Sequence, residues 1–168
     1  MKSYRTAGLL SVLALVTACA PKQPPPPDAA AIRTAILAQA QKGMDVIVSK
    51  DAAAVAAFFT DDATWILPDA TTFKGRADIQ KGAAALFASF ESATAAPVRL
   101  DRLVVISDSE ALTFMTNAGS MTIKGKKQAY TNPFADYWKK GADGVWRIAY
   151  EINAEGMAPE APAPAKRH

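Results

Sequence analysis

Aromatic and β-branched residues gather in two segments near the end of the chain, and their pattern predicts an antiparallel hairpin. The segments 130–140 and 145–153 flank the loop 141–144, which contains two glycines. Glycine can take the positive φ angles of a tight turn, and aromatic and β-branched residues favour strands. This hairpin is the strongest structural signal in the sequence.

The register of the hairpin decides which side chains share a face, because successive side chains on a strand alternate. If Lys140 pairs with Val145, Asp136 lies opposite Ala149. Glu151 is then a diagonal neighbour of Asp136, at roughly 7–8 Å. One face is expected to combine aromatic, acidic and amide side chains: Asn132, Phe134, Asp136, Trp138, Arg147, Ala149, Glu151 and Asn153. The other face is expected to be apolar: Ala135, Tyr137, Trp146, Ile148, Tyr150 and Ile152.

Three segments before the hairpin show the three- and four-residue apolar spacing of amphipathic helices. Asp28 is a good N-cap and predicts a helix that ends near Lys50. Asp51 caps a second, shorter helix, and Asp78 opens a third one that Gly82 weakens. The stripe of the first helix is the longest: Ile32, Ile36, Leu37, Ala40, Met44, Ile47 and Val48.

Strands are expected between and after the helices. Residues 63–67 form a short strand stopped at Pro68, after which 69–76 is a polar loop. Period-two alternation then predicts strands over 98–107 and 111–123. Three helices interrupted by one strand, followed by four or five antiparallel strands, indicate an α+β fold with the helices on one face of a curved sheet.

The N-terminus has the pattern of an export signal. Lys2 and Arg5 precede an apolar run over 7–16, which is too short for a permanent membrane span. The run ends in Val-Thr-Ala-Cys, which resembles the lipobox of bacterial lipoproteins. We therefore expect a lipoprotein signal peptide over 1–18, with Cys19 lipidated as the first residue of the mature protein.

An ordinary export signal is the alternative, since Ala18 and Ala20 also fit a small-residue cleavage site. Lipidation would account for Cys19, which is the only cysteine of the 168 residues. A lone thiol forms no internal disulfide and is unusual in an exported protein.

The chain is thus expected to have one domain between two irregular segments. A proline-rich linker over 19–27 holds the domain 28–156 away from the membrane, and a disordered tail covers 157–168. The expected location is the bacterial cell envelope, with a lipid anchor and the domain facing the periplasm or the outside.

Composition excludes several function classes. The chain has 19 Lys+Arg against 16 Asp+Glu, a net charge of +3, and no basic stripe of the kind that nucleic-acid binding needs. Its one histidine is His168, in the tail, so histidine chemistry in the domain is excluded. We expect no cofactor, and a metal would need an all-oxygen site, for which no ligand spacing is visible.

Three stretches carry a family resemblance: FFTDDATWILP over 58–68, FKGRADI over 73–79 and DYWKKGADGVWRI over 136–148. With the order of elements, they resemble the nuclear transport factor 2-like superfamily, in its SnoaL-like and domain of unknown function 4440 branch. The resemblance covers about 28–156 and implies a cone-shaped fold, with three N-terminal helices packed on a curved antiparallel sheet. The fold hosts isomerases, cyclases, dehydratases and non-catalytic binders, so it does not imply one activity.

Ketosteroid isomerase is the relative whose chemistry compares most directly. Its general base, an aspartate just before the proline of the first strand, corresponds to Leu67, and its oxyanion tyrosine falls near Gly43. Its second oxyanion donor, a protonated aspartate, corresponds to Asp136. Of these three catalytic groups, this sequence has only the aspartate at 136. An acid without a general base argues against enolisation. The histidine or aspartate pair of the cyclase branch is not matched, because the domain lacks histidine.

Asp136 and Glu151 remain as the candidate chemical groups. Two carboxylates in an apolar cone can share a proton and act as acid and base. Alternatively, their face of the hairpin is partly solvated or paired with Arg147. The residues expected to line a ligand pocket beside them are Trp65, Leu67, Phe134, Trp138 and Asn153.

Three functions follow as hypotheses. The first is a non-catalytic domain that binds a small apolar or amphipathic molecule. The second is a cofactor-independent isomerase or hydro-lyase that acts on a small carbonyl or hydroxy compound through Asp136 and Glu151. The third is a dimeric scaffold module. In each case we expect a homodimer through the apolar face of the hairpin, which is too large to leave in water.

Overall fold

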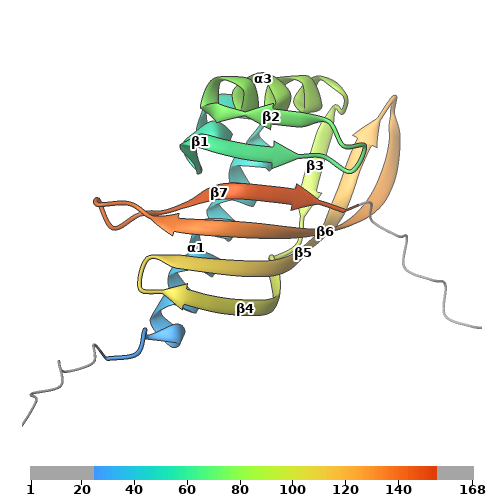
Figure 1. Ribbon diagram of the computed structural model, residues 1–168. Coiled ribbons are helices and arrows are strands. Elements are labelled where there is room, and N and C mark those ends of the chain that lie inside the picture. Colours follow the sequence, from blue (N-terminus) through green and yellow to red (C-terminus); the bar gives the residue numbers. More distant parts are fainter. Residues whose placement is uncertain (1–24, 155–168) are drawn as a thin grey trace, which may run out of the picture.

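The computed structural model describes residues 25–154 (Figure 1). The predicted signal peptide, Cys19, most of the predicted linker and the predicted tail lie outside these described residues. The helices are α1 (Ala29–Ser49), α2 (Ala52–Ala57) and α3 (Gly75–Ala88). The strands are β1 (Phe59–Ile66), β2 (Thr72–Lys74), β3 (Ser92–Ala95), β4 (Arg99–Ser107), β5 (Glu110–Ile123), β6 (Lys126–Lys140) and β7 (Trp146–Asn153).

The first two helices begin where their capping residues predict, and the first ends near Lys50 as expected. The Asp28 carboxylate accepts two backbone N–H bonds of 3.0 Å from the first turn of α1. Lys50 ends that helix with a φ of 62°. Asp51 accepts the backbone N–H of Ala54 at 2.9 Å and starts α2. These caps satisfy donors that a helix leaves unpaired at its start.

The strands form one curved sheet of order β2-β1-β7-β6-β5-β3, with β4 also paired to β5. All pairs are antiparallel except β1 with β7, which is parallel. In Figure 1 the helices lie on one side of the sheet, and no helix covers the outer face of β5, β6 and β7. The predicted α+β architecture, with helices packed on a curved sheet, is confirmed.

Several predicted boundaries were wrong. β1 begins at Phe59 instead of residue 63. The predicted loop 69–76 contains β2, and β3 was not predicted at all. Both strands are very short, so they carry no readable alternation. α3 begins at Gly75, whose positive φ of 74° allows the sharp entry, and Asp78 lies in its first turn.

The predicted hairpin register was also wrong. Lys140 pairs with Trp146, and a bulge at Ala149 then shifts the register. Beyond the bulge Asp136 lies directly opposite Glu151. One extra residue in the loop and one in the bulge change which side chains share a face.

The bulge moves two residues of the predicted apolar outer face into the core. Trp146 and Ile148 are only 3% and 8% exposed and pack inside with Trp138. Tyr150 and Ile152, which follow the bulge, are 48% and 50% exposed on the outer face. In the described part of the chain, no helix has the length and apolarity needed to cross a membrane.

Candidate functional site

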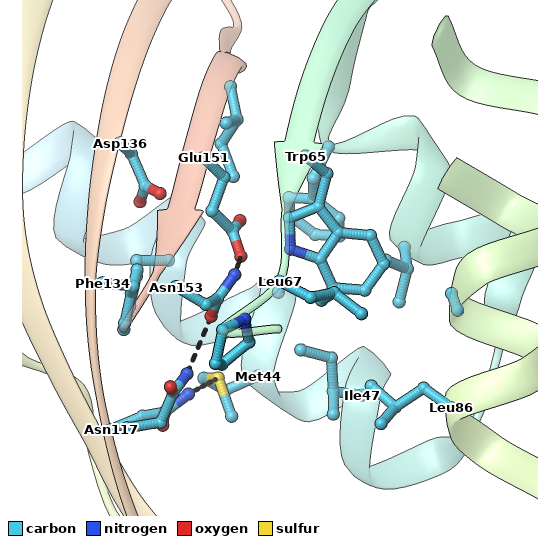
Figure 2. Close-up of a pocket in the computed structure, with 18 of the residues that line it drawn as sticks. Met44, Ile47, Trp65, Leu67, Leu86, Asn117, Phe134, Asp136, Glu151 and Asn153 are labelled. Atoms are coloured by element: carbon cyan, nitrogen blue, oxygen red, sulfur yellow. Dashed lines mark hydrogen bonds between the residues drawn. The ribbon is translucent and has the colours of Figure 1, made fainter. Parts of the chain in front are cut away.

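A cavity of about 560 Å³ lies between the helices and the concave face of the sheet (Figure 2). Its walls are mostly aliphatic and aromatic side chains from α1, α3, β1, β6 and β7. Mostly apolar walls with a few convergent polar groups are typical of small-molecule sites. The predicted pocket residues Trp65, Leu67, Phe134, Trp138 and Asn153 all line it, together with Asp136 and Glu151.

One row of paired residues crosses the cavity wall. Asp136 on β6 lies opposite Glu151 on β7, and Glu151 lies beside Trp65 on β1. Directly opposite side chains have Cβ atoms about 4.5–5.5 Å apart. The Cβ atoms of the two acids are therefore closer than in the diagonal arrangement that the sequence predicted.

Asp136 is buried without compensation. Its residue is 1% exposed, and neither carboxyl oxygen has a hydrogen-bond partner among the described residues. In Figure 2 its carboxyl group points into the cavity. Burial, followed by repulsion from Glu151, raises the pKa of Asp136 well above its usual value. The neutral acid is therefore the favoured form of Asp136.

Glu151 is held by a short chain of amides. Asn132 Nδ2 donates to Asn153 Oδ1 at 2.8 Å, and Asn153 Nδ2 donates to Glu151 Oε1 at 2.8 Å. The pKa of Glu151 is raised to about 6. Burial is the largest cause, and the Asn153 amide and the Trp65 indole partly offset it by stabilising the carboxylate. The contact of Trp65 falls short of a hydrogen bond, since its Nε1–H has no partner within the described structure.

The aromatic residues of the site differ in how they are fixed. Trp138 donates its indole N–H to Thr113 Oγ1 at 2.9 Å, so its polar atom is already satisfied. Trp65 packs between Phe59 and Phe73, with ring centroids 6.2 and 5.6 Å away, and keeps its N–H available. Trp65 is therefore the aromatic residue that can contact a ligand with both its ring and a polar atom.

The alternative pairing of these acids with Arg147 is wrong. Arg147 Nη2 forms an ion pair with Asp143 Oδ2 at 2.7 Å. This pairing lowers the pKa of Asp143 to about 2. No lysine, arginine or histidine of the described chain lines the cavity.

Asn117 and Met44 are cavity residues that sequence reasoning did not select. Asn117 is buried, its Nδ2 faces Met44 Sδ at 3.0 Å, and its Oδ1 has no partner among described residues. The inward alternation of β5, with Thr113 and Met115 on the same face, could have identified Asn117. In residues 25–154 no group of three or more His, Cys, Asp or Glu side chains could hold a metal.

Solved structures with the same fold include proteins with several different descriptions. A ketosteroid isomerase-like protein from Erwinia carotovora atroseptica SCRI1043 matches with a TM-score of 0.67 and 20% identity, covering 75% of this chain and 96% of that one. The hexachlorocyclohexane dehydrochlorinase LinA-type3 from Novosphingobium barchaimii LL02 matches with a TM-score of 0.65 and 15% identity, covering 80% and 96%. At these identities the matches establish the fold alone.

The family assignment comes from the sequence of the domain. Comparison with curated protein sequences found no significant match. The model of the SnoaL-like domain matches residues 40–150, which include α2, α3 and most of the sheet. The chain therefore belongs to the SnoaL-like domain family, within the nuclear transport factor 2-like superfamily that its sequence resembles.

Proposed function

We propose that the domain binds a small, mostly apolar molecule in the cavity, with Asp136 and Glu151 holding its polar group. The observation that carries the proposal is the set of buried polar atoms without partners. Both Asp136 oxygens, Asn117 Oδ1 and Trp65 Nε1 are unsatisfied in the described structure, and all belong to residues that line the cavity. An unsatisfied buried polar group costs about 1–3 kcal/mol, which a ligand with matching groups recovers.

A leucine at Gly43 is expected to abolish ligand binding by filling the cavity. Gly43 lines the cavity from α1, and an added Cβ would meet nothing closer than Phe58 Cδ1 at 3.9 Å. The substitution also favours the helix by up to about 1 kcal/mol, so the protein should stay folded. Binding of small aromatic compounds is measured from the NMR shift of the Trp65 indole N–H.

Ala38→Leu is the matched control, because Ala38 is exposed on the same helix. The proposal predicts that this variant binds like the parent. If Gly43→Leu binds such compounds as well as the parent does, the cavity is not the binding site.

A second candidate function is an acid–base enzyme, an isomerase or hydro-lyase. A Glu151 pKa of about 6 suits a general base near neutral pH, and a neutral Asp136 suits a proton donor. The likeness to an isomerase-like protein and to a dehydrochlorinase supports an enzyme coarsely, because both descriptions refer to enzymes. Loss of a C–H signal from a bound compound in D₂O, dependent on Glu151, would favour the enzyme over the binder.

We also propose that the protein is an envelope lipoprotein, because Cys19 follows the lipobox-like run and precedes the prolines. Cys19→Ser is expected to move the protein from the membrane fraction to the soluble fraction, since one thiol carries the acyl chains. Thr17→Ser, a neighbouring change that keeps the thiol, serves as the control. A Cys19→Ser protein that stays with the membranes contradicts lipidation.

A homodimer through the outer face of the sheet remains a proposal, with Leu112 and Phe114 in place of the buried Trp146 and Ile148. Two rows of paired side chains lie there: Leu112, Tyr137 and Tyr150 in one, and Phe114, Ala135 and Ile152 in the other. Phe114, Tyr150 and Ile152 are exposed at 40%, 48% and 50%. Adjacent exposed apolar residues of this kind mark interaction surfaces.

Ile152→Asp is expected to convert the dimer into a monomer, because it places a charge within the apolar rows. Val48→Asp is the control, since Val48 is exposed on α1. Sedimentation at micromolar concentration measures both. A parent protein that sediments only as a monomer rules the dimer out.

A further inference from the structure

The cavity has an unusual charge balance. Asp136 and Glu151 are its only acidic lining residues in the described chain, and no basic side chain from α1, α2, α3, β1 or β5 faces them. The other titratable lining residue is Tyr130, on β6, whose pKa burial raises, so it stays neutral. The site therefore contains acid groups and aromatic walls without a counter-ion.

We propose that the ligand of this cavity carries a protonated amine, which lies between Asp136 and Glu151 while its apolar part contacts Trp65. This inference rests on the proposed binding function and adds the chemical class of the ligand.

The hydrogen-bonding capacity of the two acids fits an ammonium group. Asp136 offers two unpartnered oxygens, and Glu151 has a second oxygen beyond the one that Asn153 bonds. An ammonium group has three donors and no acceptor, so it can bond all three of these oxygens once Asp136 has given up its proton. A hydroxyl group has one donor, so it can bond only one of the three oxygens when both acids are ionised.

The surroundings of the acids fit the same group. Asn153 donates to Glu151 at 2.8 Å and so favours its ionised form. An ionised carboxylate in an apolar cavity attracts a cation more strongly than one in water does. The Trp65 ring, beside Glu151 in the row, adds an aromatic face that favours cations.

Binding of a cation must depend on pH through the same two groups. An ammonium ion favours the ionised carboxylates, so amine affinity should rise as the pH increases through the Glu151 pKa of about 6. A neutral alcohol of the same shape has no such preference, and its affinity should not rise.

The experiment uses three probes that differ in their polar group: 2-phenylethylamine, 2-phenylethanol and 3-phenylpropionate. Calorimetry on the full chain at pH 5 and pH 7.5 gives their affinities. At pH 7.5 the amine is expected to bind at least about tenfold more tightly than the alcohol, and the propionate most weakly. Lowering the pH to 5 should remove most of the advantage of the amine.

Two variants locate the effect. Glu151→Gln is expected to reduce the preference for the amine to less than about threefold, with little change for the alcohol. Glu110→Gln is the control, since Glu110 lies on the sheet surface and bonds the Tyr137 hydroxyl at 2.6 Å. Its probe affinities should match those of the parent.

The outcomes separate this inference from the proposed function. If the alcohol binds as tightly as the amine at pH 7.5, the amine inference is wrong and the binding function stands. If none of the three probes binds, both are wrong for ligands of this size. A preference for the amine that survives in Glu151→Gln also overturns the inference, because the charge would then act elsewhere.

Discussion

Replacing Asp136 with asparagine is expected to stabilise the protein at pH 8, by on the order of 1–3 kcal/mol. Asp136 is buried in an apolar cavity with no hydrogen-bond partner in the described chain, and it faces a second acid. Asparagine has nearly the same shape and no charge. The substitution therefore removes both the burial of a charge and its repulsion from Glu151.

The sign follows from the direction of the pKa shifts. Both acids have a higher pKa in the folded protein than in the unfolded chain, so the unfolded state loses its protons first as the pH rises. For Glu151, a pKa raised from 4.5 to about 6 means that about 2 kcal/mol of stability is lost between these pH values. The loss of stability that comes from Asp136 begins near pH 4 and continues until the pH reaches the raised pKa of Asp136 in the folded protein. Asp136→Asn should flatten this decline and have little effect below pH 4.

Urea unfolding at pH 4 and pH 8 measures the difference. Asp143→Asn is the matched control in the same hairpin, because Arg147 lowers the pKa of Asp143 to about 2. Because the pKa of Asp143 is lower in the folded protein than in the unfolded chain, ionised Asp143 stabilises the fold at pH values above its pKa in the unfolded chain. Its replacement should therefore be neutral or destabilising at pH 8. An Asp136→Asn protein that is less stable than the parent at pH 8 would show that Asp136 is not an uncompensated buried acid.

Local signals in the sequence were sufficient for the helices and for the class of fold. Asp28 and Asp51 cap α1 and α2 as predicted, because N-cap chemistry involves only neighbouring residues. The first half of β5 alternates clearly between buried and more exposed residues, because one of its faces packs into the core. Each of these features depends on a few consecutive residues.

The register of β7 could not be predicted in the same way. The bulge at Ala149 lets Trp146 and Ile148 face inward together with Glu151, which no strict alternation allows. A bulge depends on how a strand fits its partners on both sides, and β7 pairs with β6 and with β1. Sequence alternation alone therefore placed Asp136 and Glu151 on the correct face but not directly opposite each other.

The cavity itself depends on contacts between distant residues. Met44 and Asn117 meet in its wall although they are 73 positions apart. The amide chain from Asn132 through Asn153 to Glu151 joins β6 and β7 through the orientation of three side chains. Asn153 was predicted as a pocket residue, but its bond to Glu151 was not predicted.

Replacing Asn153 with leucine is expected to raise the pKa of Glu151 from about 6 by at least about one unit. Leucine has a similar size but cannot donate the 2.8 Å hydrogen bond that stabilises the ionised Glu151. A hydrogen bond to a charged group contributes about 1.5–3 kcal/mol, and one pKa unit corresponds to about 1.4 kcal/mol. Carboxyl titration followed by NMR measures the shift directly in the ligand-free protein.

Asn117→Leu is the control, because it removes an amide from the same cavity that makes no hydrogen bond to either acid. It should leave the pKa of Glu151 within about 0.3 units of the parent value, a free-energy change of about 0.4 kcal/mol. Equal shifts in both variants would mean that cavity polarity, and not the Asn153 bond, sets this pKa. If the shift is specific to Asn153→Leu, about half of Glu151 is protonated at pH 7 in that variant. The preference for an amine at pH 7.5 should then weaken in it without any change to a carboxyl group.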